Sequence, residues 1–300
     1  MKTLLITGGA GFLGSSIVKQ FSSNYRIIVL EHSAANLERL LKIDADSLTI
    51  ISSDSLEDTE NIFKYEKIHA VIHCAVNYGR NGDIRNIIET NLLLPLTLLH
   101  FAVKYKTELF INTDTFFNSE KNHEYNYLKE YTLSKKQILE WLKLSAISEI
   151  KIVNLRIFHL FGENDNPDKF ATDIITRLLK NVNSISLTEC SQERDFIYLR
   201  DAVKAYETIL KKAEIIQPGY NHFEAGTGEP VSVKFFVEKI KQLTGSTSEL
   251  KFGVLQMRQN EIMQSKADNK SLSEIGWRPD YTLEEALKAT IDFYKRSLEI

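Results

Sequence analysis

An apolar segment at residues 3–7 runs directly into the sequence Thr7-Gly8-Gly9-Ala10-Gly11-Phe12-Leu13-Gly14. Glycines at positions 8, 11 and 14 permit a tight turn and let the backbone come close to a bound group. A helix that begins here presents free N–H groups, at Phe12 and Leu13, and the positive end of its dipole to a phosphate. A strand, a glycine turn and a helix in this order predict a site for the pyrophosphate of a dinucleotide.

Apolar runs predict the fold of the first half of the chain. They alternate with amphipathic segments of helical periodicity, and continuously apolar strands separated by helices indicate a parallel sheet covered on both faces. The predicted strands are residues 3–7, 26–30, 48–52, 70–74, 109–112 and 150–158. We therefore expect a doubly wound parallel α/β sheet of the Rossmann type over residues 1–158.

The second half has a looser pattern. Gly162, Asn164 and Pro167 predict an irregular loop, and helical segments mixed with short strand-like pieces follow it. We expect residues 159–300 to form a smaller mixed α/β lobe that binds the substrate, with some segments returning to the first domain. Ligands of open parallel sheets bind at the carboxyl ends of the strands, and we expect the lobe to cover that edge.

The composition excludes several classes of protein. The chain has 300 residues, 43% of them hydrophobic, and a formal net charge of −3, so it can bury a core and gives no basis for nucleic-acid binding. Cys74 and Cys190 lack CxxC spacing, which argues against a disulfide framework or a metal site and fits a reducing cytoplasm. The first apolar run is too short for a signal peptide, and residues 92–103 fall short of the roughly 20 that span a membrane. We expect a cytoplasmic protein without membrane partners.

The ends of the second and third strands indicate which dinucleotide is bound. Glu31 ends the second strand, where a carboxylate can accept hydrogen bonds from both adenosine ribose hydroxyls and would repel a 2′-phosphate. This favours NAD(H), although Glu31 could also be an ordinary solvated charge at a strand end. His32, Ser33 and Arg39 could form a pocket that tolerates phosphate, so NADP(H) stays an alternative. Further candidate cofactor contacts at these strand ends are His32, Asp54 and Ser55.

A second signature lies more than a hundred residues further along, where Tyr131 and Lys135 are four residues apart. On a helix such a pair shares one face. A nearby ammonium stabilises a phenolate and lowers the tyrosine pKa from about 10, so that the phenol can exchange a proton near neutral pH. Any surface helix can carry this spacing by chance. A hydroxyl-bearing strand end, Asn112-Thr113-Asp114-Thr115, lies upstream and strengthens the assignment.

With these residues in place, the chain resembles the extended short-chain dehydrogenase/reductase family over nearly its whole length. The resemblance implies that Thr113 orients the substrate oxygen, that Tyr131 shuttles a proton, and that Lys135 tunes Tyr131 and holds the nicotinamide ribose. It also implies cofactor contacts from Cys74 and Ala75. Beyond the glycine turn it is carried by His73-Cys74-Ala75-Val76, Asn91, Tyr131-Thr132-Leu133-Ser134-Lys135 and Arg194-Asp195-Phe196-Ile197-Tyr198.

Departures from the family pattern narrow the reaction. Sugar-nucleotide 4,6-dehydratases carry Thr-Asp-Glu where this chain has Thr113-Asp114-Thr115, so the base for dehydration is missing and Asp114 is left as a candidate substrate contact. Phe117-Asn118 replaces the usual Tyr-Gly, and His159 replaces the usual Asn after the sixth strand. His159 is therefore either a substrate contact or a buried core imidazole.

The resemblance also implies a nucleotide-sugar substrate. Arg194 and Arg258 come from separate segments, and two guanidinium groups can clamp a diphosphate, with surface ion pairing as the alternative. Tyr78, just past the fourth strand, is expected to flank the sugar. Residues 258–263 and 276–279 are similar to 4-ketoreductases of CDP-linked 3,6-dideoxyhexoses, while related enzymes act on dTDP, GDP or UDP sugars. The base and the sugar therefore follow from likeness alone.

These inferences together predict NAD(P)H-dependent reduction of the C4 ketone of a nucleotide-linked deoxysugar, in the synthesis of O-antigen or other surface-polysaccharide precursors. A nucleotide-sugar 4-epimerase with tightly bound NAD uses the same triad and is the alternative enzyme. A sensor or scaffold that binds NAD(P) without turnover is the alternative from another class.

The helices that contain Asn91 and Tyr131 predict a homodimer, because family members often associate through them. Pro95 is expected to kink or interrupt the first of these helices. The apolar positions that could serve the dimer or, equally, the intramolecular core are Leu93, Leu96, Leu99, Ile138 and Leu142.

Overall fold

The computed structural model describes residues 1–43, 46–56, 58–80, 82–118, 127–146 and 149–299. The chain divides into two compact units. Within the described residues, the first unit contains residues 1–118, 127–156 and 206–223, and the second contains residues 157–205 and 224–299. The chain thus enters the second unit at residue 157 and returns to the first for residues 206–223.

A seven-stranded sheet forms the centre of the first unit, in the order β11-β6-β5-β4-β1-β2-β3. The pairs β1–β2, β2–β3, β1–β4 and β4–β5 are all parallel. The strands are β1 (Thr3–Thr7), β2 (Arg26–Glu31), β3 (Leu48–Ser52), β4 (Ile68–His73), β5 (Leu109–Thr115), β6 (Lys151–Ile157) and β11 (Gly219–Ala225). This order confirms the predicted doubly wound sheet, with its topological switch point between β1 and β4, where such folds bind their ligands.

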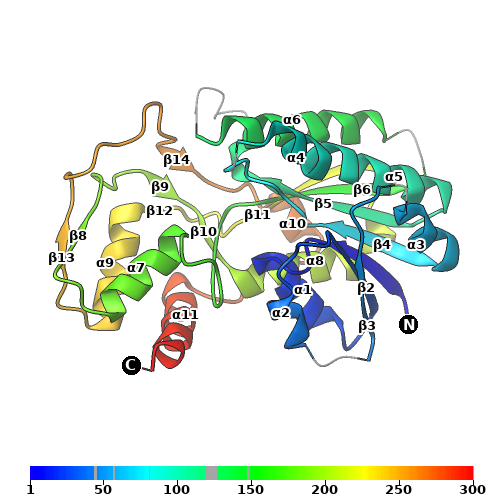
Figure 1. The fold of residues 1–300 in the computed structure, drawn as a ribbon. Coiled ribbons are helices and arrows are strands. Elements are labelled where there is room, and N and C mark those ends of the chain that lie inside the picture. Colours follow the sequence, from blue (N-terminus) through cyan, green and yellow to red (C-terminus); the bar gives the residue numbers. More distant parts are fainter. Residues whose placement is uncertain (44–45, 57, 81, 119–126, 147–148, 300) are drawn as a thin grey trace. The chain divides into compact units, whose positions relative to one another are not determined.

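Helices cover both faces of this sheet (Figure 1), and this is why its strands are largely apolar. All of β1 is buried. On one face the side chains of Leu5, Val71 and Phe110 pack with Leu98 and Leu142 from the covering helices. The helices are α1 (Phe12–Phe21), α2 (Glu38–Leu41), α3 (Thr59–Tyr65), α4 (Ile84–Ile88), the π-helical turn η1 (Glu89–Leu93), α5 (Leu94–Lys104), α6 (Lys129–Leu144) and α8 (Leu199–Lys211), with the short turns η2 (Phe116–Asn118) and η4 (Ala213–Ile215).

One long helical segment, residues 84–104, joins α4, η1 and α5. Pro95 lies in the first turn of α5, and the interruption predicted there takes the form of the π turn that precedes it. The segment is 21 residues long with a mean hydropathy of 1.3, so by length and composition alone it could cross a membrane. Buried core helices pass the same test, and Leu98 and Phe101 of this segment belong to the core of the first unit.

The apolar positions suggested for a dimer divide into two groups. Leu99, Ile138 and Leu142 are buried in the core of the first unit, as the intramolecular alternative requires. Leu93 is 45% exposed, and Leu96 is only partly buried. The neighbouring exposed apolar side chains on the same helices are Ile84, Ile88, Leu133, Trp141 and Leu144.

The second unit is a mixture of short strands and helices. Small sheets pair β7 with β10, β8 with β13, and β9 with both β12 and β14. The Phe196 and Phe236 rings stack in its core, with centroids 3.8 Å apart. Its strands are β7 (His159–Phe161), β8 (Ser184–Ser186), β9 (Glu193–Arg194), β10 (Phe196–Tyr198), β12 (Val231–Ser232), β13 (Glu249–Lys251) and β14 (Gln264–Ser265), and its helices are α7 (Phe170–Leu179), α9 (Val233–Thr244), α10 (Lys270–Glu274) and α11 (Leu283–Ser297).

Candidate active site

The glycine turn between β1 and α1 is closed tightly against the end of β4. Gly8 has φ of +69°, and a Cβ there would lie 2.5 Å from the Ala75 backbone nitrogen. A Cβ on Gly14 would lie 2.0 Å from the Gly8 carbonyl oxygen. Side chains at either position would displace the backbone. Gly11 occupies the N-cap of α1 and has no side chain to cap the first N–H groups of the helix, at Phe12 and Leu13, which are the donors that a pyrophosphate requires.

Glu31 lies beside this turn at the end of β2. Its Oε1 accepts a hydrogen bond from the Ala10 backbone N–H at 2.7 Å, and Arg39 Nη1 donates to the Ala10 carbonyl oxygen at 3.4 Å. Burial raises the pKa of Glu31, while the N–H groups of Ala10 and Gly9 and the charge of His32 oppose that shift. A glycine cradle that no Cβ could enter, with a carboxylate at its side, fits a dinucleotide.

The other candidate contacts at these strand ends are engaged with one another. Asp54 accepts hydrogen bonds from the Ser33 N–H at 2.9 Å and from the Ser33 hydroxyl at 2.5 Å, which lower the pKa of Asp54. His32 Nδ1 accepts from the Ala34 N–H at 3.1 Å. The Ser55 hydroxyl accepts from the Asp58 N–H at 3.3 Å. The loops that follow β2 and β3 are therefore joined by the Ser33–Asp54 contact.

Tyr131 lies in the first turn of α6 and is only 5% exposed. Its ring packs against Tyr78, with centroids 5.0 Å apart, and edge-on against Phe117, with centroids 6.2 Å apart. Burial raises the pKa of Tyr131 well above its usual value, and Tyr78 raises it further, while a hydrogen bond with Thr115 lowers it. The expectation that the environment lowers this pKa is therefore wrong for the protein alone, because desolvation of the phenolate is the largest effect.

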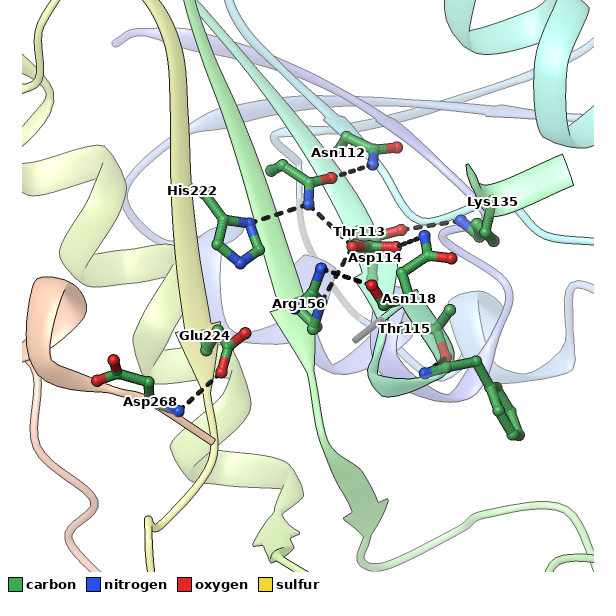
Figure 2. A network of polar contacts seen from close by, with 12 residues as sticks. Asn112, Thr113, Asp114, Thr115, Asn118, Lys135, Arg156, His222, Glu224 and Asp268 are labelled. Carbon is green, nitrogen blue, oxygen red and sulfur yellow. Dashed lines mark hydrogen bonds and ion pairs between the residues drawn. The ribbon is translucent and has the colours of Figure 1, made fainter. Parts of the chain in front are cut away.

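Lys135 shares the buried face of α6 with Tyr131, as the spacing predicted. Its Nζ donates to the Thr113 carbonyl oxygen at 2.8 Å (Figure 2). Burial lowers the pKa of Lys135, and Asp114 and Cys74 oppose that shift. Among the described residues, no hydrogen bond joins the Lys135 ammonium to the Tyr131 phenol.

Thr113 turns its hydroxyl toward α8. The Thr113 Oγ1 lies 2.7 Å from the Tyr206 hydroxyl and 3.2 Å from Cys74 Sγ. Burial raises the pKa of Cys74 to about 11, so this thiol stays protonated. Thr115, two residues further along β5, has the effect of lowering the pKa of Tyr131. The role that the resemblance implies for Thr113 stays a prediction.

Asp114 points to the opposite side of β5, into a buried polar network (Figure 2). Its carboxylate accepts hydrogen bonds from Asn118 Nδ2 at 2.6 Å, Asn154 Nδ2 at 2.9 Å and Arg156 Nε at 3.3 Å. Arg156 Nη2 also donates to the Asn118 carbonyl oxygen at 3.2 Å. The candidate substrate contact Asp114 is thus surrounded by partners from its own unit, and its side chain is 1% exposed.

Sequence reasoning missed the partners in this network. Asn154 and Arg156 are polar residues at alternate positions of β6, a strand that is otherwise apolar. Asn154 Oδ1 also accepts from Asn112 Nδ2 at 2.7 Å. The available signal was two pairs of polar residues with a spacing of two: Asn154 and Arg156 within the predicted sixth strand, and Asn112 and Asp114 where the predicted fifth strand ends.

Asn91 fixes the loop that carries Tyr78. The Asn77 N–H donates to Asn91 Oδ1 at 2.8 Å, and Asn91 Nδ2 donates back to the Asn77 carbonyl oxygen at 2.8 Å. Asn91 Nδ2 also donates to the Ser134 hydroxyl at 2.9 Å, and that hydroxyl donates to the Tyr131 carbonyl oxygen at 2.8 Å. The π turn η1 therefore links the Tyr78 loop to the helix of Tyr131, and π turns often occur at functional sites.

The remaining substrate candidates lie in the second unit. Arg194 is buried and donates to Glu261 Oε1 at 2.6 Å and to the Ile262 carbonyl oxygen at 2.5 Å. Arg258 is exposed in the segment that leads to Glu261. Burial lowers the pKa of His159 well below its usual value, and Arg194 acts in the same direction, so the imidazole is neutral at pH 7.

Known proteins with a similar sequence or fold identify the family of this chain. The model of the NAD dependent epimerase/dehydratase family matches residues 4–226. CDP-abequose synthase of Salmonella muenchen is 34% identical over 291 residues, 96% of each chain, and CDP-abequose synthase of Salmonella typhimurium is 32% identical over 95% of this chain and 97% of the relative. The structure of UDP-glucose 4-epimerase from Thermotoga maritima has the same fold, with a TM-score of 0.85 and 24% identity over 99% of both chains. The chain therefore belongs to the NAD dependent epimerase/dehydratase family, within the extended short-chain dehydrogenases/reductases, and is an NAD-dependent enzyme.

Proposed function

We propose that this enzyme reduces the C4 ketone of a nucleotide-linked deoxysugar of the CDP-4-keto-3,6-dideoxyhexose type. The observation that carries the proposal is the buried phenol of Tyr131 on the face of α6 that Lys135 ties to the end of β5, where this chain has Thr115 and dehydratases carry a carboxylate base. Similarity to two CDP-abequose synthases over nearly the full chain supports the sugar class.

In the reduction, a hydride adds to the C4 carbon and a proton adds to the C4 oxygen. When bound, the reduced nicotinamide supplies the hydride. Burial raises the pKa of Tyr131, so at neutral pH the phenol holds the proton that the developing alkoxide needs. Lys135, anchored on the Thr113 carbonyl, holds a positive charge near the position where negative charge develops.

The glycine turn and Glu31 of the first unit hold the cofactor. The second unit is the substrate-binding lobe, in which Arg194 and Arg258 bind the diphosphate and His159 contacts the sugar. Tyr78, in the loop after β4, is a further candidate contact for a sugar. Synthesis of surface-polysaccharide precursors places such an enzyme in the cytoplasm.

Cofactor stoichiometry tests the reaction. The purified protein is incubated with a CDP-4-keto-3,6-dideoxyhexose and NADH or NADPH, and both oxidised nicotinamide and the reduced sugar are measured. One oxidised nicotinamide per reduced sugar supports the proposal. Net interconversion of UDP-hexose epimers without added reduced cofactor would identify an epimerase instead, and dinucleotide binding without turnover of any 4-keto nucleotide sugar would identify a sensor or scaffold.

We also propose that the enzyme is a homodimer that associates through α4, η1 and α6. The exposed apolar side chains on these helices support this surface, since exposed apolar patches commonly mark interaction sites. The side chains with the largest exposed fractions are Ile84, Leu133, Trp141 and Leu144.

A further inference from the structure

We propose that Tyr206 of α8 is a positioning residue for the ketone reduction: its phenol holds the Thr113 hydroxyl so that the Thr113 proton points to the substrate oxygen. The proposal rests on the proposed function and on the role that the family resemblance implies for Thr113, which is to orient that oxygen. Tyr206 lies outside the sequence motifs that carry the resemblance. Its hydroxyl contacts Thr113, and it acts on the reaction through that residue.

The phenol of Tyr206 is completely buried. Tyr206 is 0% exposed, as is Ile209, which follows on the same face of α8. A buried phenol O–H needs a hydrogen-bond partner, because leaving it unpaired costs the full desolvation of the group. That partner is the Thr113 hydroxyl, whose Oγ1 lies 2.7 Å from the Tyr206 oxygen, the usual length of a bond between two hydroxyls. One side chain of α8 therefore reaches the end of β5.

The Thr113 oxygen has a second neighbour, the Cys74 thiol, at 3.2 Å. Burial raises the pKa of Tyr206 well above its usual value and that of Cys74 to about 11, so both groups keep their protons at neutral pH and both can donate. A hydroxyl oxygen accepts two hydrogen bonds and donates one. When Tyr206 and Cys74 donate, both acceptor positions of Thr113 are filled, and its own proton is left for a third group.

The opposite direction of the bond between Tyr206 and Thr113 is less favourable. If Thr113 donated to Tyr206, the Tyr206 proton would be buried without a further oxygen or nitrogen acceptor among the described residues. A phenol, with an ordinary pKa of about 10, is also a stronger acid than an alcohol and is therefore the better donor of the two. Tyr206 is accordingly the donor and Thr113 the acceptor.

Two helices hold Thr113, each through a different part of the residue. Lys135 of α6 donates to the Thr113 carbonyl oxygen at 2.8 Å and so fixes the backbone, while Tyr206 of α8 fixes the side chain. The χ1 angle of a threonine is restricted, because two heavy atoms branch at its Cβ. The direction of the Thr113 O–H is thereby set before the substrate binds.

A donor fixed in this way acts at the step where charge develops. As the hydride adds to C4, negative charge builds on the C4 oxygen, and a donor that is already oriented needs no reorganisation at that moment. The bond from Tyr206 also polarises the Thr113 hydroxyl and strengthens the hydrogen bond that Thr113 gives. Thr113 keeps its proton, and Tyr131 supplies the one that is transferred. Because the benefit grows with the charge on the oxygen, loss of the Tyr206 hydroxyl should lower kcat more than it changes KM.

Tyr206→Phe tests the proposal, because it removes the hydroxyl and keeps the buried ring. With a CDP-4-keto-3,6-dideoxyhexose and NADH as substrates, we expect kcat to fall about threefold to tenfold, the effect of losing one neutral hydrogen bond, with both KM values within about twofold of the wild type. Tyr294→Phe is the matched control, because it also removes a buried tyrosine hydroxyl that contacts a threonine, Thr172, at 3.3 Å, in the second unit. Both variants should have a lower melting temperature, but only Tyr206→Phe should have a lower kcat.

A double-mutant cycle with Thr113→Val shows whether Tyr206 acts through Thr113. Thr113→Val should lower kcat by itself, by roughly a hundredfold, since it removes a donor to the developing charge. In that background Tyr206→Phe should change kcat by no more than about twofold, because the hydroxyl that it positions is already gone. A Tyr206 hydroxyl that serves stability alone would instead change kcat by the same factor in both backgrounds, or in neither.

Two results overturn the proposal: wild-type kcat in Tyr206→Phe, or an equal loss with and without the Thr113 hydroxyl. Full activity of Thr113→Val overturns it as well, because the group that Tyr206 positions then takes no part in the reaction. In all three cases the wild type still reduces the ketone, so the proposed function stands. A wild type that oxidises no NADH with this sugar refutes the proposed function itself, and the role of Tyr206 falls with it.

Discussion

The Lys135 ammonium nitrogen lies 2.8 Å from the carbonyl oxygen of Thr113, so the end of β5 and the buried face of α6 are held together by one charged hydrogen bond. This contact places the positive charge of Lys135 at the strand end. Asp114 and Cys74 lie near it, and both raise the pKa of Lys135. Lys135 therefore acts on the site through the backbone of β5 as well as through its charge.

Tyr131→Phe is expected to lower kcat for ketone reduction by roughly two orders of magnitude or more, since it removes the proton donor and keeps the ring. The ring contacts with Tyr78 and Phe117 need no hydroxyl, so the fold should persist. Steady-state rates and NADH affinity by fluorescence titration provide the measurement. Wild-type turnover in this variant would exclude the phenol as the proton donor.

Glu31→Ser should shift the cofactor preference toward NADP(H). The carboxylate repels a 2′-phosphate, and serine removes that charge while keeping a small polar group. Loss of charged hydrogen bonds to the ribose, about 1.5–3 kcal/mol, should lower kcat/KM with NADH about tenfold to a hundredfold. Glu140→Ser is a suitable control, because it removes an exposed carboxylate that is not among the candidate cofactor contacts and that pairs with Lys143. An unchanged ratio of kcat/KM for the two cofactors in Glu31→Ser would show that Glu31 does not select the cofactor.

Local sequence patterns predict much of the fold, but they do not predict the buried polar network around Asp114. Strands β1 to β4 are continuous apolar runs, which the sequence displays directly. The fifth strand was predicted to end at residue 112, yet β5 continues to Thr115. Its polar end is stable in the sheet because residues distant in sequence form hydrogen bonds with it. Asn154 of β6 donates to Asp114, and the Tyr206 hydroxyl of α8 pairs with the Thr113 hydroxyl. No local pattern contains those pairings.

The ion pair between Arg156 and Asp114 should dominate the stability of this strand end. Arg156→Met leaves a buried carboxylate without its cation, which costs about 3–5 kcal/mol of unfolding free energy. The double variant Asp114→Asn with Arg156→Met should lose clearly less than the sum of the two single losses. Urea unfolding of the three variants measures this coupling, and strict additivity would show that the pair does not interact energetically.

Trp141→Glu combined with Leu144→Glu should convert the proposed dimer to a monomer. Both side chains are more than half exposed on α6, and a charged group in an apolar interface is costly to desolvate. Sedimentation velocity measures the change. Val254→Glu, at a 60% exposed apolar position of the second unit, is the matched control. A wild-type sedimentation coefficient that already corresponds to a monomer would refute the proposed association, as would a dimer that survives both substitutions.

His159 should make the protein less stable as the pH falls below about 6.5, the ordinary pKa of histidine. Burial and Arg194 depress the pKa of His159 in the folded chain, so between that depressed pKa and 6.5 the unfolded chain binds the proton and the folded chain does not. Titration of His159 therefore leaves the unfolding free energy unchanged above about pH 6.5. Below that pH it lowers the unfolding free energy by up to about 1.4 kcal/mol per pH unit. Asn does not titrate, so His159→Asn should show a shallower decline in urea unfolding between pH 7.5 and 5.5. Equal slopes for wild type and His159→Asn would mean that His159 takes up its proton equally in both states.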